Sequence, residues 1–157
     1  MLFPFEDTSS RNQVLLRYVQ EALRQNKAIV HLCDDPERDR QVVEGVRQNQ
    51  VRIMAVQDVY GKSLHVEKAV DFWRRETESA LSRGFSGLAE SADGTSVLSE
   101  DLLRFEATLG RELRIDSMTA LCLYDARRFD LGSENLLLKL LSTHGHVIFP
   151  GVAGRMY

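Results

Sequence analysis

A carboxylate in an apolar helix stripe is the first residue of this chain whose position suggests chemistry. The stripe of the helix expected over residues 101–114 consists of Leu102, Glu106, Leu109 and Leu113. Burying a carboxylate is costly unless the group is paired or hydrogen-bonded. Two interpretations of Glu106 therefore stay open: a stripe-edge residue that reaches water, and a polar anchor inside a pocket with a shifted pKa.

Glu90 is the second candidate, because it follows a strand expected over residues 85–89. In an open parallel sheet, ligands bind outside the carboxyl ends of the strands. Asp34, Asp58 and Asp125 also follow expected strands, so we expect one acidic rim. Acidic residues after strands also cap helices, and the pattern fits both roles.

Two short motifs resemble binding sites but lack the residues that complete them. Gly61-Lys62-Ser63 resembles the end of a phosphate loop, yet Gln57 and the other residues before it provide no glycine to open that loop. His144-Gly145-His146 could hold a metal, but no Cys/His/Asp/Glu set with ligand spacing accompanies it. We therefore expect neither nucleotide binding nor a metal site, and no cofactor.

The sequence offers no good catalytic nucleophile. Cys33 and Cys122 each lie in an apolar run, which is typical of buried, unreactive cysteines in a reducing compartment. No G-x-S-x-G motif is present. The chain is therefore expected not to be an enzyme.

The elements that position these residues alternate between strands and helices. Apolar runs predict strands over residues 28–33, 51–56, 85–89, 118–124 and 146–149, with an abbreviated strand at 2–5. Helices are expected over residues 11–25, 36–49, 101–114 and 135–143. Their expected N-terminal caps are, in the same order, one of residues 8–10, residues 34–35, Ser99 and Ser133. This alternation predicts an α/β fold with three layers, a mainly parallel sheet and helices on both faces.

A further long helix begins at Val66, after a connecting loop at residues 58–64, and is followed by Gly84 in the position of a C-terminal cap. Its buried stripe is Val66, Ala69, Val70, Trp73, Thr77, Ala80 and Leu81. Phe72 lies off this stripe. It either widens the buried face or forms the aromatic wall of a pocket.

Composition limits the class of protein. The 157 residues fit a single domain over 1–157. A net charge of −3 without a basic cluster argues against direct nucleic-acid binding. No apolar run approaches the roughly 20 residues of a membrane span, and no secretory signal opens the chain. The cytoplasm is the expected location.

Six blocks of residues, in order, resemble one known family. They are Phe5-Glu6-Asp7, Phe72-Trp73-Arg74, the stretch 83–88, Phe105-Glu106, the stretch 120–125, and His144. The chain resembles the MEDS domain, a sensory domain named for methanogens, methylotrophs and the dichloromethane-dehalogenase regulator. It departs from that family at its opening, where residues 1–4 replace the usual His-Ile-Cys strand, and it ends at Tyr157 without an output domain.

The resemblance implies a degenerate RecA/KaiC-like core that has lost its phosphate loop, and a non-catalytic sensory role. It also implies a small, often hydrocarbon-like ligand and an output through a histidine kinase, a transcription factor or a sigma-factor regulator. That signalling partner would be bound in trans or fused to the domain. The candidate ligand-binding residues are Phe72, Glu90, Glu106, Tyr124 and His144. An interaction module without a ligand and a degenerate nucleotide-binding protein stay open as alternatives, as does a homo-oligomer.

Overall fold

Five parallel strands form one sheet at the centre of the molecule, in the order β1-β5-β4-β2-β3. The computed structural model describes residues 1–46, 48–61, 63–94, 96, 99–112, 117–129 and 134–148. The strands are β1 (Leu2–Phe5), β2 (Ala28–Cys33), β3 (Val51–Ala55), β4 (Leu88–Asp93) and β5 (Met118–Asp125). The predicted α/β class and parallel sheet are confirmed.

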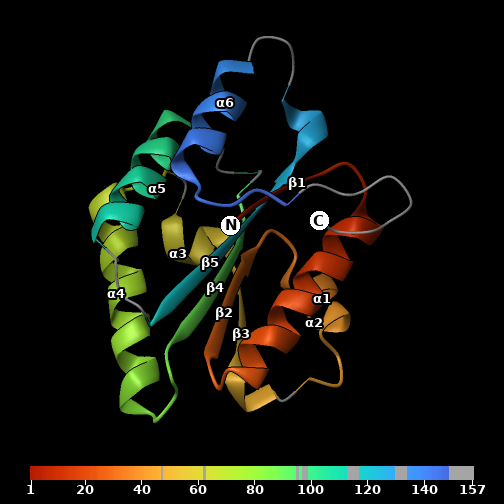
Figure 1. Ribbon diagram of the computed structural model, residues 1–157, viewed down its shortest axis with the longest axis vertical. Helices are drawn as coiled ribbons and strands as arrows, with labels where there is room; N and C mark the ends of the chain where they lie inside the picture. The colour runs from red at the N-terminus through yellow and green to blue at the C-terminus, as the bar shows by residue number, and fades with distance from the viewer. Residues whose placement is uncertain are drawn as a thin grey trace.

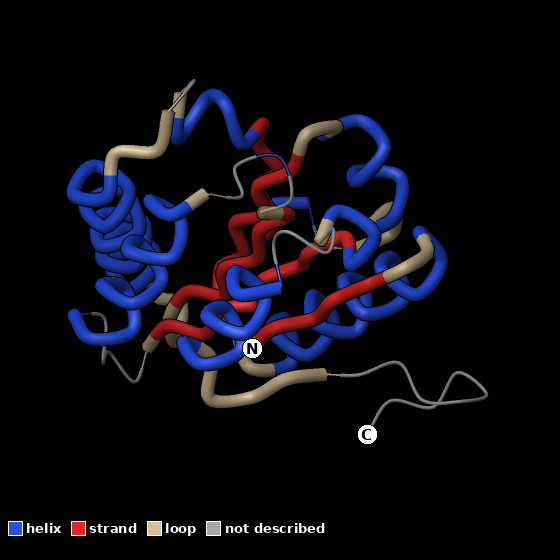
Figure 2. Tube along the Cα trace, turned by 90° about the horizontal axis from the view of Figure 1, so that it is seen from above, coloured by secondary structure: helices blue, strands red, loops and turns tan. Residues whose placement is uncertain are grey.

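Helices cover both faces of this sheet, as predicted. They are α1 (Thr8–Arg24), α2 (Pro36–Val42), α3 (Val56–Tyr60), α4 (Val66–Ser82), α5 (Glu100–Glu112) and α6 (Glu134–Thr143), with short 3₁₀ turns at Gln48–Gln50 and Ala126–Arg128. In Figure 1, α1 and α2 lie on one side of the sheet and α4 and α5 on the other. Figure 2 shows the same layers from above, with the strands between two groups of helices.

The strand that carries Glu90 begins later than predicted. Residues 85–87 form a turn after Gly84, which has a φ of +85°. At Gly87 the backbone passes so close to Ser117 that an added Cβ would lie 1.9 Å from the Ser117 carbonyl oxygen. The prediction of a strand over 85–89 was therefore wrong. Glu90 is the third residue of β4, inside the sheet rather than beyond its carboxyl end.

Several element boundaries also differ from those expected. Helix α1 begins at Thr8, because Asp7 caps it by accepting from the Ser10 amide. Helix α2 ends at Val42 instead of near residue 49, ahead of Gly45, which has a φ of +89°. Asp58 lies in α3 rather than in a loop.

The last described segment pairs with β1 through a single bridge. The Leu2 amide donates to the His146 carbonyl at 2.9 Å, and the Ile148 amide donates to the Leu2 carbonyl at 2.8 Å. Leu2 and Val147 form an isolated parallel bridge. The strand predicted over 146–149 is thus reduced to this contact, and Phe149 lies outside the described residues.

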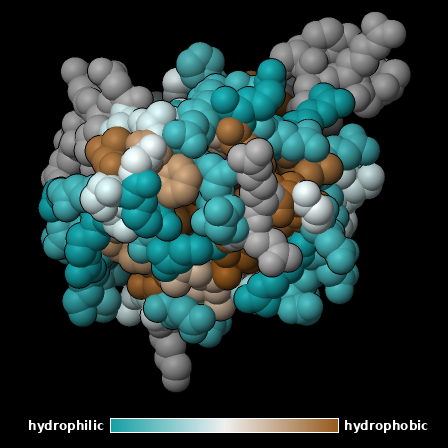
Figure 3. All heavy atoms as spheres, turned by 90° about the horizontal axis from the view of Figure 1, so that it is seen from below, coloured by the Kyte–Doolittle hydropathy of each residue, from teal (hydrophilic) through white to brown (hydrophobic). Residues whose placement is uncertain are grey.

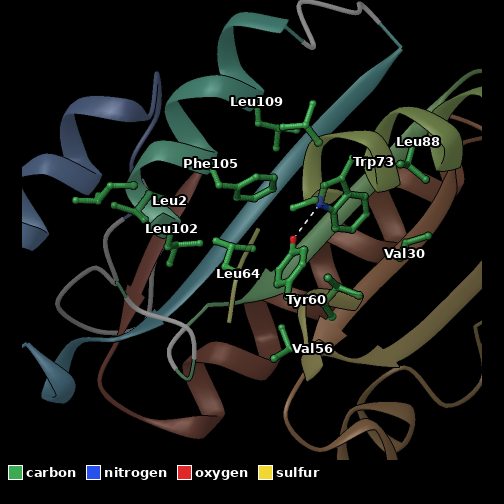
Figure 4. Close-up of a cluster of buried hydrophobic side chains, with 14 of the residues drawn as sticks. Leu2, Val30, Val56, Tyr60, Leu64, Trp73, Leu88, Leu102, Phe105 and Leu109 are labelled. Carbon is green, nitrogen blue, oxygen red and sulfur yellow. Dashed lines mark hydrogen bonds between the residues drawn. The ribbon is translucent and has the colours of Figure 1, made fainter. Parts of the chain in front are cut away.

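Trp73 anchors the larger of the two hydrophobic clusters, between the sheet and α4 and α5. Its indole nitrogen donates to the Tyr60 hydroxyl at 2.9 Å, and Phe105 and Leu109 of α5 lie nearby (Figure 4). The predicted α4 stripe is confirmed from Ala69 to Ala80, whereas Val66 at its start is only partly buried. Leu81 is 45% exposed rather than buried.

The face of the molecule seen from below carries many hydrophilic side chains. This face, opposite to that of Figure 2, shows small hydrophobic patches separated by polar residues (Figure 3). Of the helices in the described ranges, none is both long enough and apolar enough to cross a membrane.

Candidate functional site

Three of the five predicted site residues meet between β5, α5 and the end of α6. The Tyr124 hydroxyl donates a hydrogen bond to Oε1 of Glu106. Nε2 of His144 lies 3.6 Å from Oε2 of Glu106, and both side chains are less than one-tenth exposed. Glu106 is therefore held inside the fold, and the interpretation in which it reaches water at the stripe edge does not describe it.

Local sequence patterns explain how these residues come to face one another. In α5, Leu102 and Leu109 are buried with Glu106, so the helical period carries the carboxylate to the sheet. In β5, Cys122 and Tyr124 are two residues apart and share one face of the strand. His144 follows α6 directly.

A pocket of about 170 Å³ opens beside these side chains. Its described lining residues are Met1, Glu106, Leu109, Gly110, Met118, Ala120, Cys122, Thr143, His144 and Gly145. The polar side chains that converge on it are those of Glu106, Thr143 and His144, with the Cys122 thiol. Small ligand sites commonly combine an apolar wall with a few convergent polar groups of this kind.

Glu90 lies on the same face of the sheet but deeper. Its side chain is almost fully buried, and its Oε2 has no hydrogen-bond partner among the described residues. Burial, and secondarily the negative charge of Glu106, raises the pKa of Glu90 to about 8. Glu90 does not line the pocket, but its charge state influences the field around Glu106.

Phe72 is not among the described residues that line the pocket. It is half-buried in α4, and its ring lies edge-on to Trp73 with a centroid distance of 4.9 Å. This placement corresponds to the interpretation in which Phe72 widens the buried face of the helix.

Two residues of the expected acidic rim, Asp34 and Asp125, already have local partners. Asp125 accepts from the Arg127 amide and pairs with the Arg127 guanidinium at 2.7 Å. Asp34 accepts from the Ser96 hydroxyl at 2.6 Å.

Gly61 ends α3, and Lys62, the lysine of the phosphate-loop resemblance, lies outside the described residues.

A buried ionic network on the opposite face of the sheet was missed by sequence reasoning. Arg11 of α1 donates to both carboxylate oxygens of Asp39, at 3.0 and 2.5 Å, and to Asp93 at 3.0 Å. His31 lies 2.8 Å from Asp39 through Nε2 and 2.8 Å from the Ser91 hydroxyl through Nδ1. The only signal in the sequence was His31, which interrupts an otherwise apolar strand.

The charged groups of this network pair with one another. Burial alone would raise the pKa of Asp39, but hydrogen bonds from His31 and Arg11 and the charge of Arg11 outweigh it and hold that pKa well below its usual range. Because these polar groups are paired with one another, the cluster is suited to holding α1, α2, β2 and β4 together rather than to binding a ligand.

A larger hollow of about 670 Å³ lies between α2 and the edge strand β3. Two of the charged side chains that line it, Glu37 and Arg40, pair with each other at 2.9 Å. Both side chains are exposed and already paired with each other, so this hollow is a weaker candidate than the Glu106 pocket.

The fold and the pocket together define an α/β domain that encloses a small polar site between its sheet and two helices. The family model described as MEDS, the methanogen/methylotroph, DcmR sensory domain, matches residues 1–145, and the chain belongs to this family. The match includes all five predicted site residues and confirms the resemblance. No curated protein matches the chain significantly.

Proposed function

We propose that this sensory domain binds a small ligand in the Glu106 pocket and transmits that binding to a signalling partner. The observation that carries the proposal is the convergence of a carboxylate, a hydroxyl, an imidazole and a thiol, from three separate elements, on one small pocket. Such convergence is a general property of ligand sites, and the sensory character of the family agrees with it.

The pocket limits the size of the ligand. A cavity of about 150 Å³ can hold a benzene molecule, and the Glu106 pocket measures about 170 Å³. A compound or ion of that size fits inside the pocket. The size therefore favours a small ligand over the alternative of a degenerate nucleotide-binding protein.

Helix α6 is the element that would report the ligand. Thr143 and His144, at its end, contact the Glu106 carboxylate. A ligand that binds Glu106 and His144 more tightly in one arrangement than another shifts the population toward that arrangement. The output would be a histidine kinase, a transcription factor or a sigma-factor regulator, fused to the domain or bound in trans.

Exposed leucines favour a second candidate, an interaction module without a ligand. Leu138 on α6 is 63% exposed, and Leu81 on α4 is 45% exposed. In the ligand-sensing proposal, the outer face of α6 is where the partner would read the change. The two candidates differ in whether a small molecule or ion binds at all.

We further propose that the domain acts without catalysis and in the cytoplasm. Burial, and then the nearby charge of Glu106, raises the pKa of the Cys122 thiol well above its usual range, which is the opposite of an activated nucleophile. Cys33 and Cys122 are both free, which fits a reducing compartment.

Thermal-shift screening of small metabolites, halocarbons and metal ions tests the proposal. We expect at least one compound to raise the Tm of the wild-type chain and to lose that effect in Glu106→Gln. The matched control, Glu78→Gln, changes an exposed carboxylate of α4 and should keep the full shift. An equal shift in Glu106→Gln, or no shift from any compound, would contradict the proposal.

A further inference from the structure

Three groups that bind transition metals converge on the Glu106 pocket. A carboxylate oxygen of Glu106, the sulfur of Cys122 and a ring nitrogen of His144 lie within 4.8 Å of one another. In a tetrahedral zinc site, bonds of about 2.0–2.3 Å place neighbouring ligand atoms roughly 3.3–3.8 Å apart. The 3.6 Å between Glu106 Oε2 and His144 Nε2 already falls in that range.

His144 is oriented as metal-binding histidines are. Its Nδ1 lies 2.7 Å from the Leu140 carbonyl oxygen, so we assign the ring proton to Nδ1, which donates this bond. Nε2 then carries a lone pair on the side of Glu106. A backbone carbonyl that accepts from the second ring nitrogen is a common way to fix the tautomer and orientation of a ligating histidine.

Glu106 is positioned by its neighbours in the same manner. The Tyr124 hydroxyl donates to Oε1 and leaves Oε2 toward His144. The Thr143 hydroxyl lies 3.3 Å from Oε2 but only 2.8 Å from the Leu140 carbonyl, so its single hydrogen has a nearer acceptor. Oε2 therefore keeps a lone pair for a metal ion.

The pocket leaves room for a fourth, exchangeable ligand. Its volume of about 170 Å³ adjoins the three donor groups, so a water molecule can complete the coordination. A divalent cation would meet the Glu106 carboxylate and a Cys122 thiolate, with the thiol proton released to solvent. The charges of ion and ligands then cancel.

A second cluster of metal-binding residue types does not qualify. His31, Cys33 and Asp39 also lie within 4.8 Å of one another. Both oxygens of Asp39, however, accept from the Arg11 guanidinium, so a cation already occupies that position.

We infer that Glu106, Cys122 and His144 form a binding site for a divalent transition-metal ion of the Zn²⁺ and Co²⁺ type, and that this ion is the sensed ligand. A mixed sulfur, nitrogen and oxygen donor set favours such ions over Mg²⁺ and Ca²⁺, which take oxygen ligands. The inference rests on the proposed function, because it names the ligand class of the same pocket.

Titration of the metal-free, full-length chain with Co²⁺, followed by absorption spectroscopy, tests the inference. A stoichiometric amount of Co²⁺ should give visible bands of tetrahedral cobalt and a thiolate-to-cobalt charge-transfer band, and Zn²⁺ should abolish both. Cys122→Ser should remove the charge-transfer band. His144→Gln should weaken Co²⁺ binding at least about tenfold.

Two matched controls should leave the spectra unchanged. Cys33→Ala removes the other cysteine, which lies in the Asp39 cluster, and His146→Gln removes an exposed histidine two residues from His144. Where Cys122→Ser fails to fold by circular dichroism, His144→Gln decides the outcome.

Absence of a stoichiometric cobalt complex, or a charge-transfer band that survives in Cys122→Ser, overturns the inference. An organic compound that stabilises the chain through Glu106 without any Co²⁺ binding would overturn the metal assignment and leave the proposed function intact. If neither class of ligand binds, both the inference and the proposed function fail.

Discussion

At the scale of single residues, two buried carboxylates, Glu106 and Glu90, differ in their surroundings. Glu106 has Tyr124, Thr143 and His144 around it. Glu90 has an oxygen with no hydrogen-bond partner among the described residues. Oε2 of Glu106 thus faces His144, whereas burial raises the pKa of Glu90.

Glu90 should make the stability of the domain depend on pH. Its pKa is raised to about 8 in the folded chain, against an ordinary value of 4.5. Between these values the folded state holds a proton that the unfolded state has lost. The free energy of unfolding therefore falls as pH rises from about 4.5 to about 8, by a total on the order of a few kcal/mol.

Urea unfolding of the metal-free chain across this pH range measures the effect. Glu90→Gln should flatten the profile and make the domain more stable than wild type above pH 8, while Glu78→Gln at the surface should follow the wild-type curve. A wild-type slope that persists unchanged in Glu90→Gln would show that other groups cause it.

At the scale of elements, the close approach of Gly87 to Ser117 sets where β4 begins. Gly87→Ala would drive a methyl group against the Ser117 carbonyl and should lower the free energy of unfolding by about 1–3 kcal/mol or more. Gly110→Ala in α5 is the matched control, because an added Cβ there meets nothing within 4 Å.

Denaturant unfolding distinguishes the two glycine variants. Gly110→Ala should be neutral or more stable than wild type by up to about 1 kcal/mol, because alanine is the better helix former. Equal stability of the two variants would mean that the turn at residues 85–87 yields easily and does not fix the start of β4.

The type of most long elements was predictable from local patterns, but α3 was expected as a loop, and positions within elements often differed from those predicted. The stripe around Trp73 and the cap at Gly84 depend on neighbours within one helix, and both were predicted. The start of β4 depends on Ser117, thirty residues away, which no local pattern reveals. Glu90 was therefore placed at the rim, although it lies inside the sheet.

From residue patterns alone, the candidate site was predictable only where one residue was anomalous by itself. Glu106 interrupted an apolar stripe, and the family resemblance supplied Tyr124 and His144. Cys122 had no such signal, because cysteine in an apolar strand is ordinary. Arg11 and Asp39 are 28 residues apart, and their pairing arises only when α1 and α2 pack on the same face.

At the scale of the whole molecule, the sheet separates a buried polar network from a pocket. The network on the α1–α2 face joins four elements through Arg11 and Asp39. Asp39→Asn should destabilise the fold by about 3–5 kcal/mol, because it leaves the Arg11 charge buried without compensation. Glu37→Gln, in an exposed pair on the same helix, should cost less than about 1 kcal/mol.

Acid should weaken the same network. Because the pKa of Asp39 is held below its usual 3.8, its contribution to stability is complete above that pH and is lost as the pH falls toward the folded-state value. Urea unfolding of wild type and Asp39→Asn at falling pH measures this. The gap between the two proteins should narrow in acid, and a constant gap would contradict the assignment.

The most direct test of the central claim is a nuclear magnetic resonance titration of the isotope-labelled full chain with Zn²⁺ and with small compounds that raise its Tm. We expect a binder to shift the amide signals around Glu106, Cys122 and residues 143–145, and the signals of α6 to move with them. Shifts confined to the hollow between α2 and β3, or no saturable shifts from any of these ligands, would contradict it.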